Sequence, residues 1–411
     1  MPTAPVPPPM PGTEPAPASE RLAAIDGIRG FALLGILLMN IEAFNGPLWL
    51  SAAGVDPRWE GLDRWLDTAI YVLVQGSFFP LFSLLFGMGC GLMAQRMQAR
   101  GQAFAPLHLR RMGWLAVIGL LHAVLVWSGD ILLSYALLGL LLPALYVLPP
   151  RWLGWAGALG IACAAGVALL LAGMLGLMGL AVEDGDSTAQ MVAQIKAGVQ
   201  AQVDLYGQGS WLQACGQRLK DMGTNLQGLF VVGGQVLGLF LIGSWLVSSQ
   251  ALANPAAHAR LWALLRWLAW PAGVLLSLCT LAISPFNPPW SMEPASMLVQ
   301  AIKTVAGSLI GLGWLAWGLR LQALLRPLAP AGQMSLTTYL CQSLIGTGVF
   351  YGYGLGWFGQ LSRSQEVVFV LVVFALQVLL ATWWLRHFRQ GPVEWLWRMA
   401  SYGRRLPLRR A

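Results

Sequence analysis

Long apolar segments separated by short polar stretches dominate the chain from residue 27 onward. A helix needs about 20 predominantly apolar residues to span a bilayer. Ten segments meet this requirement, at residues 27–47, 66–95, 112–128, 131–149, 152–182, 225–249, 262–283, 298–319, 334–356 and 366–386. The pattern predicts an all-α, polytopic membrane protein of about ten transmembrane helices. Pro80 predicts a kink within the second segment.

The two ends of the chain differ from this apolar region. Residues 1–20 contain eight prolines and predict a disordered tail. Residues 21–386 form the predicted helical bundle, with one long polar loop at 183–224. Residues 387–411 contain a short segment, PVEWLWR, in which Glu394 complements the N-terminal dipole of a helix, followed by a basic tail. The C-terminal region therefore predicts an interfacial helix on the membrane surface.

Composition and charge agree with a membrane protein and suggest its orientation. The chain is 57% hydrophobic and 10% charged, whereas soluble domains carry about 25% charged residues. With a cytoplasmic N-terminus, 18 of the 25 Lys and Arg residues fall on the cytoplasmic side. This bias follows the positive-inside rule and predicts that both termini are cytoplasmic. For a bacterial-looking chain, we expect the inner membrane, with the 183–224 loop in the periplasm.

The same distribution bears on partners and cofactors. The net charge of +8 is spread over loops, so we expect membrane lipids as partners and no nucleic acid. The five cysteines form no ligand cluster, and we expect no metal. There is no P-loop, HExxH or G-x-S-x-G pattern, so no strong enzyme signature is present.

The first apolar segment contains an acid, a base and an amide: Asp26, Arg29 and Asn40. These three fall within about 60° of one another on a helix. Asp26 and Arg29 can form an i, i+3 ion pair that fixes the helix end, or Arg29 can present its guanidinium to a phosphate or carboxylate. Asn40 can bond another helix or orient an acceptor hydroxyl. Polar residues in a membrane span often mark a site.

His122 is the one histidine placed well inside an apolar segment. It can act as a general base, or it can be a core histidine bonded to a neighbouring helix. Asp130 lies at the turn that follows and can cap the next helix or take part in catalysis. On a continuous helix these two residues would lie about 80° apart, so both can line one cavity, but direct contact does not follow. Tyr135 adds a hydroxyl one turn further along.

A polar stripe also marks the start of the ninth segment. Ser335, Tyr339 and Gln342 share one helical face because steps of four and three residues stay on the same side. The stripe can hold helices together or contact a substrate.

The sequence resembles the YeiB family of bacterial multispan membrane proteins. The matching segments cover nearly the whole chain after the proline tail. They are DGIRGFALLGI from Asp26, FSLLFG from Phe82, GDIL from Gly129, GQMSLTTYLCQS from Gly332 and GPVEWLWR from Gly391.

The Asp-x-x-Arg-Gly opening and the later Asn40 are also similar to the first span of the transmembrane acyltransferase superfamily. That superfamily includes acyltransferase-3 proteins and heparan-α-glucosaminide N-acetyltransferase. The likeness implies transfer of an acyl group from cytoplasmic acyl-CoA to a sugar or similar acceptor. In the glucosaminide enzyme a histidine between the first two spans is catalytic, but this chain has no histidine between Asn40 and Gly87. His122 is the candidate to replace it.

These observations leave three functional hypotheses open. In an acyltransferase, Arg29 with Arg110 or Arg111 would hold acyl-CoA phosphates, and His122 or Asp130 would deprotonate a sugar, lipid or other small acceptor. In a transporter or exporter of a small or amphipathic solute, Asp26, Arg29, His122 and Asp130 would line the path. In a scaffold, the same buried charges would only fix the packing.

Overall fold

The computed structural model describes residues 18–181, 185–291 and 293–410, and this part of the chain is helical without any extended strand. The predicted all-α class is confirmed. Helix α1 begins at Ala18, inside the segment predicted as a tail, and the rest of that tail lies outside the described residues. The elements up to the middle of the chain are α1 (Ala18–Asn45), η1 (Leu48–Leu50), α2 (Gly61–Leu73), α3 (Phe78–Gln98), α4 (Phe104–Leu125), α5 (Leu132–Gly139), α6 (Leu142–Leu145), α7 (Pro150–Ala181) and α8 (Gly185–Gly207). The remaining elements are α9 (Trp211–Ser248), α10 (Ala259–Leu264), the π-helical turn η2 (Leu265–Ala269), α11 (Trp270–Ile283), α12 (Pro294–Arg320), α13 (Gln322–Leu325), η3 (Arg326–Leu328), α14 (Ala329–Gln333), α15 (Ser335–Phe350), α16 (Arg363–His387) and α17 (Pro392–Tyr402).

Seven helices in the described residues are long and apolar enough to cross a membrane. They are Ala24–Asn45, Gly61–Gln98, Pro150–Leu177, Trp211–Ser248, Ala259–Ile283, Pro294–Arg320 and Arg363–His387. The other three predicted segments also form helices, namely α4, α5 with α6, and α15. The protein is therefore a multi-pass helical membrane protein, while the count of ten spans stays a prediction.

The break in the second predicted segment lies before Pro80. Helix α2 ends at Leu73 and α3 begins at Phe78, and Gly76 between them has φ +80°, which a helix cannot contain. Pro80 lies in the first turn of α3, where its missing N–H costs nothing. In place of the kink predicted at Pro80, the helix is interrupted at Gly76.

Close contacts between small residues hold the bundle together. A Cβ on Gly30 would collide with the carbonyl oxygen of Leu328, and a Cβ on Gly332 would collide with that of Asp26. Helix α1 and the short elements from α13 to α14 therefore touch backbone to backbone. Helices α3 and α9 meet in the same way, because Gly87 faces the carbonyl of Phe240. Such contacts are how helices associate where the hydrophobic effect between them is weak.

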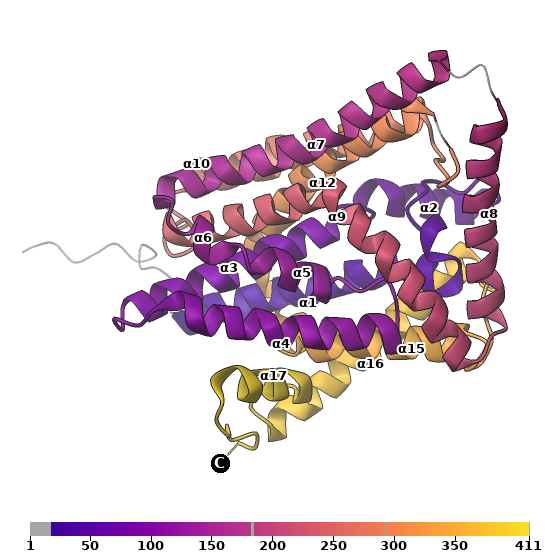
Figure 1. Ribbon diagram of the computed structural model, residues 1–411. Helices are drawn as coiled ribbons and strands as arrows, with labels where there is room; N and C mark the ends of the chain where they lie inside the picture. The colour runs from indigo at the N-terminus through magenta and orange to yellow at the C-terminus, as the bar shows by residue number, and fades with distance from the viewer. Residues whose placement is uncertain (1–17, 182–184, 292, 411) are drawn as a thin grey trace, which may run out of the picture.

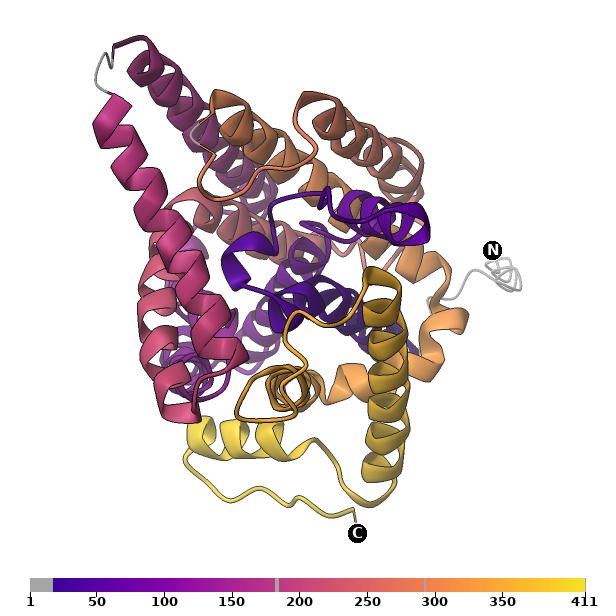
Figure 2. The ribbon, with the colours of Figure 1, turned by 90° about the vertical axis from the view of Figure 1, so that its right-hand side faces the viewer.

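Two helices lie outside the main direction of the bundle. Helix α8 runs across the end of the bundle opposite to the start of α1, as Figures 1 and 2 show. The segment predicted as the periplasmic loop, 183–224, thus consists in its described part of α8 and the beginning of α9. Helix α17 packs beside α4, where Trp397 Nε1 donates to the carbonyl of Arg111 at 2.9 Å.

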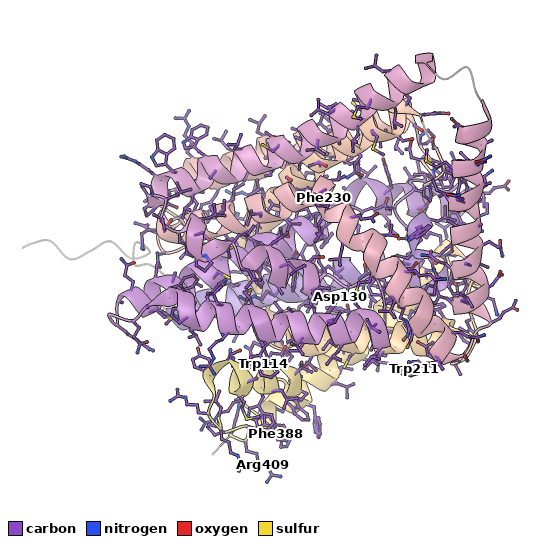
Figure 3. The ribbon with its side chains drawn as sticks, viewed as in Figure 1. Trp114, Asp130, Trp211, Phe230, Phe388 and Arg409 are labelled. Carbon is purple, nitrogen blue, oxygen red and sulfur yellow. The ribbon has the colours of Figure 1, made fainter. Side chains whose placement is uncertain are left out.

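Large apolar side chains point away from the bundle on the outer helices. Trp114 and Phe230, labelled in Figure 3, are 44% and 84% exposed. In the most apolar stretch of α7, only 17% of the residues are buried within the protein, and the share is the same in α10–α11. In a membrane this apolar surface contacts lipid.

Candidate functional site

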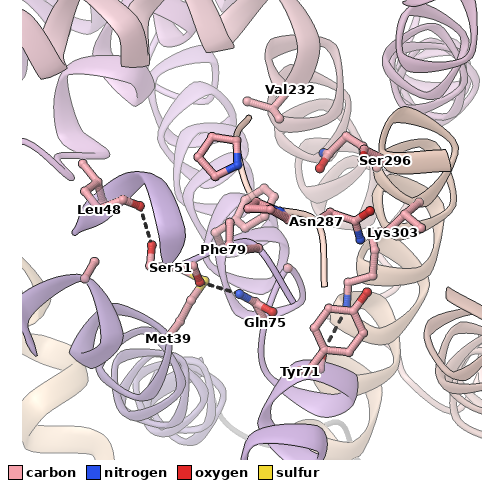
Figure 4. Close-up of a pocket in the computed structure, with 18 of the residues that line it drawn as sticks. Met39, Leu48, Ser51, Tyr71, Gln75, Phe79, Val232, Asn287, Ser296 and Lys303 are labelled. Carbon is pink, nitrogen blue, oxygen red and sulfur yellow. Dashed lines mark hydrogen bonds between the residues drawn. The ribbon is translucent and has the colours of Figure 1, made fainter. Parts of the chain in front are cut away.

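A cavity of about 450 Å³ lies between the helices beside η1, the short helix that also contacts α8. Helix α1 contributes Met39 and Asn40 to its wall, α9 contributes Gln235, and α12 contributes Lys303. Tyr71, Gln75 and Phe79 enter from the broken α2–α3 pair (Figure 4). The volume is that of a small-molecule site, and such sites occur between the helices of a bundle.

Two segments distant in sequence form one side of this cavity. Residues 51–53 and 287–291 both line it. The Asn287 N–H donates to the carbonyl of Ala53 at 2.5 Å, and the Val55 N–H donates to that of Pro285 at 2.8 Å. Gln75 Nε2 donates to the Ser51 carbonyl at 2.5 Å, which fixes the first segment to the break between α2 and α3 (Figure 4). The interruption of the helix at Gly76 therefore helps to shape the cavity.

Lys303 is the one charged residue among the described residues that line the cavity. Its ammonium group donates to the Tyr71 carbonyl at 2.8 Å and lies 4.0 Å from the centre of the Tyr71 ring. No carboxylate of the described residues lies within ion-pair distance of it. Our sequence reasoning missed Lys303 by counting it only for topology, although a lysine inside an apolar segment was a visible signal.

His122 and Asp130 are in direct contact. Helix α4 ends at Leu125, and the chain turns back so that His122 Nδ1 lies 2.7 Å from Asp130 Oδ2. Both side chains are at most 2% exposed. The other carboxylate oxygen accepts the Leu133 N–H at 2.7 Å, so Asp130 caps α5 as well as binding the histidine. The two alternatives for Asp130, cap and chemistry, therefore do not exclude each other.

Beside an ionised Asp130, the hydrogen bond at Nδ1 assigns the tautomer of the neutral His122 ring. An ionised carboxylate only accepts, so Nδ1 carries the hydrogen and Nε2 keeps its lone pair. Nε2 of His122 is buried and has no hydrogen-bond partner among the described residues. A histidine held by a carboxylate at one nitrogen and unpaired at the other has the arrangement of a general base.

The turn that carries Asp130 connects the pair to the cavity. Trp127 and Gly129 line the cavity, and Asp130, the next residue in the chain, binds His122; neither His122 nor Asp130 is itself among the lining residues. Helix α9 holds the turn, because Asn225 Nδ2 donates to the Ser128 carbonyl at 2.7 Å. The Tyr339 hydroxyl accepts the Ile131 N–H at 3.3 Å, and its ring lies 5.4 Å from that of His122. The Asp130 side chain is 1% exposed, whereas Trp114 is 44% exposed; both are labelled in Figure 3.

The polar residues of the first span are divided between two places. Asp26 and Arg29 form an ion pair of 2.9 Å at the beginning of α1, with side chains 16% and 29% exposed. Asn40 lies on the cavity wall, about 16 Å further along the helix by its rise per residue. The structure thus places Asn40 near the His122 turn and leaves the Asp26–Arg29 pair far from it.

Three of the other predicted site residues, Tyr135, Gln342 and Arg111, serve contacts between helices. Tyr135 donates to the Phe79 carbonyl at 3.0 Å, and Gln342 bonds the α1 backbone and Gln377 of α16. Arg111 stacks on Trp397 at 4.2 Å, while Arg110 is exposed. Ser335 is the first residue of α15 and does not line the cavity. Of the predicted stripe, only Tyr339 contacts the turn beside the cavity.

A second polar cluster went unnoticed in the sequence. Arg363 contacts Asp67 at 2.9 Å, Glu366 at 2.7 Å and Glu42 at 3.5 Å, joining α16 to α2 and α1. Arg363 and Glu366 stand three residues apart at a helix start, a visible pairing, but the acids of α1 and α2 gave no sign of a common partner. The cluster holds the start of α16 to the last turn of α1 and to the middle of α2.

Comparison with known proteins adds a family to this geometry. Residues 246–404 match a family described as a protein of unknown function, DUF418. The chain is 32% identical to "Uncharacterized protein YeiB" of Escherichia coli, over 93% of this chain and 96% of that protein. It is 30% identical to "Uncharacterized protein YxaH" of Bacillus subtilis, over 96% and 97%. Both relatives match nearly the whole of this chain, and the chain belongs to the YeiB family.

Proposed function

We propose that this protein transfers an acyl group to a small acceptor held in the cavity, with His122 as the general base. The observation that carries the proposal is the buried His122–Asp130 pair, whose Nε2 is unpaired among the described residues and whose turn reaches the cavity at Gly129. The carboxylate orients the imidazole and stabilises the imidazolium that forms when Nε2 takes a proton. Asn40, on the neighbouring wall, would orient the acceptor.

The reaction moves one proton from the acceptor to the leaving thiolate and replaces the carbon–sulfur bond of the thioester with a bond from the acyl carbon to the acceptor. The acceptor hydroxyl or amine gives its proton to Nε2 of His122 as its oxygen or nitrogen attacks the thioester carbonyl. The carbon–sulfur bond then breaks, and the leaving thiolate takes the proton from the imidazolium. Acyl-CoA is the expected donor, with the partly exposed Arg29 as a contact for its phosphates at the far end of α1. The proposal sets the protein in a bacterial inner membrane, with α8 on the periplasmic side.

The test measures acyl-CoA turnover by purified protein in detergent or nanodiscs. We expect His122→Ala and Asp130→Asn to reduce turnover by about 100-fold or more, because general-base catalysis contributes on that order. Asp130→Asn keeps an acceptor for the Leu133 N–H, so the helix cap survives the change. His387→Ala is the matched control, because His387 is exposed at the end of α16. Turnover that is equal in the wild type and His122→Ala refutes the proposal.

A second candidate is transport of a small or amphipathic solute, and the cavity wall favours it. Several helices contribute polar side chains to a space that contains one cation, as in a solute pathway. Proteoliposome flux of an unmodified solute, retained in His122→Ala and lost in an Asn40 or Lys303 variant, would support transport over acyl transfer.

A further inference from the structure

We infer that the cavity binds an anionic group, a carboxylate or a phosphate, on the ammonium of Lys303. This inference rests on the proposed function only in assigning the anion to the acyl acceptor. It starts from the charge of the wall, because Lys303 is a cation and no acidic side chain lines the cavity in the described part of the chain.

A buried ammonium without a counter-ion is unfavourable unless something compensates it. The Tyr71 carbonyl accepts one hydrogen bond from the Lys303 ammonium, and the centre of the Tyr71 ring lies 4.0 Å from the same ammonium. A lysine ammonium has three N–H donors, so two remain for other partners. In Figure 4 the Lys303 side chain extends along the cavity toward Tyr71. An anion in the cavity would supply the missing charge.

The surrounding groups fit a small anionic group better than a cation. Asn40 and Ser291 line the same cavity and carry N–H and O–H donors. Ser296 donates its own hydroxyl hydrogen to Ser291, which leaves the Ser291 hydrogen free to point at a ligand. A metal cation would need several oxygen ligands with at least one carboxylate, and the wall formed by the described residues has no carboxylate. The site therefore selects anions by charge as well as by hydrogen bonding.

The occupant could be a free metabolite anion or a lipid headgroup, and two arms of one experiment separate these sources. Full-length protein is placed in phosphatidylcholine nanodiscs, and its melting temperature is measured. In one arm inorganic phosphate or acetate is added at an ionic strength matched with sodium chloride. In the other arm, phosphatidylglycerol replaces part of the lipid. A ligand that binds only the folded state raises the melting temperature, by roughly 3 °C or more at concentrations far above its Kd.

Where the added anion or lipid raises the melting temperature of the wild type, we expect no rise for Lys303→Gln and a partial rise for Lys303→Arg. Lys220→Gln is the matched control, because it removes the same charge from an exposed position on α9. Lys303→Met separates binding from structure. Without anion it should melt at or above the wild-type temperature, because a lone buried charge has been removed, whereas a purely structural lysine would lower that temperature.

Two results would overturn the inference: equal stabilisation of Lys303→Gln and the wild type, or no stabilisation of the wild type in either arm beyond that of sodium chloride. His122→Ala should keep the anion response, because His122 does not line the cavity. An intact anion response in a wild-type protein that shows no acyl turnover would therefore count against the proposed function alone. Acyl turnover by a wild-type protein that shows no anion response would count against the anion site alone.

Discussion

The N-terminus of α15 is capped by Glu394, which comes from a different helix. The carboxylate accepts the Leu336 N–H at 2.7 Å, the Thr337 N–H at 3.0 Å and the Thr337 hydroxyl at 2.5 Å. Glu394→Ala removes both acceptor oxygens, and with them all three hydrogen bonds, and leaves two N–H groups of a helix start without a partner in a largely buried place. At roughly 1–2 kcal/mol for each N–H, the expected loss of unfolding free energy is about 3 kcal/mol.

The assay is reversible unfolding of the purified protein in mixed detergent micelles, followed by tryptophan fluorescence. Glu293→Ala is the matched control. Glu293 also precedes a helix, α12, but it is exposed and makes no side-chain cap, so we expect a change within about 0.5 kcal/mol. If the Glu394 and Glu293 variants lose the same stability, α15 is not held by this carboxylate and the reasoning is wrong.

Three further predictions concern stability, each measured by the same unfolding assay. Burial raises the pKa of the Glu394 carboxyl above 4.5. The wild type should therefore exceed Glu394→Gln in stability by the largest margin below pH 4.5, and this margin should shrink as the pH rises through the raised pKa. A margin that grows with pH refutes this prediction. Arg363→Met should cost about 3–5 kcal/mol, because three carboxylates lose their cation, while Arg58→Met at an exposed ion pair should cost at most about 1 kcal/mol. Gly30→Ala should cost about 1–3 kcal/mol through collision with Leu328, whereas Gly113→Ala, whose Cβ meets no atom within 4 Å, should be neutral or stabilising.

The positions of the helices could be predicted from hydrophobicity because a membrane leaves the backbone few options. Every buried N–H and C=O must be satisfied within its own segment, so each long apolar run becomes a helix. The exceptions have local causes. Gly76, with its positive φ, breaks the second segment before Pro80, and no hydropathy pattern distinguishes these two residues as the breaking point.

Contacts between segments were much harder to predict. The sequence predicted that Glu394 complements the dipole of its own helix, but its carboxylate reaches another helix that starts 59 residues earlier in the chain, at Ser335. The contact between His122 and Asp130 depends on where α4 ends, because a continuous helix would keep the two side chains apart. Residue type and spacing identified these side chains as unusual, while only the path of the chain defines their partners.

The first span illustrates the same difference within a single helix. At its beginning, Gly27, Gly30 and the Asp26 carbonyl meet the segment from Leu325 to Gly332 so closely that no side chain fits between them. This packing accounts for the glycines of DGIRG without any ligand, and the Asp26–Arg29 pair borders it. Asn40, in contrast, faces a cavity that also borders Lys303 and the turn of the His122–Asp130 pair. Chemistry at the membrane is therefore to be sought at the end of α1 near α8. A variant of Arg29 that loses activity while its fold is intact would then report on the donor rather than on the acceptor.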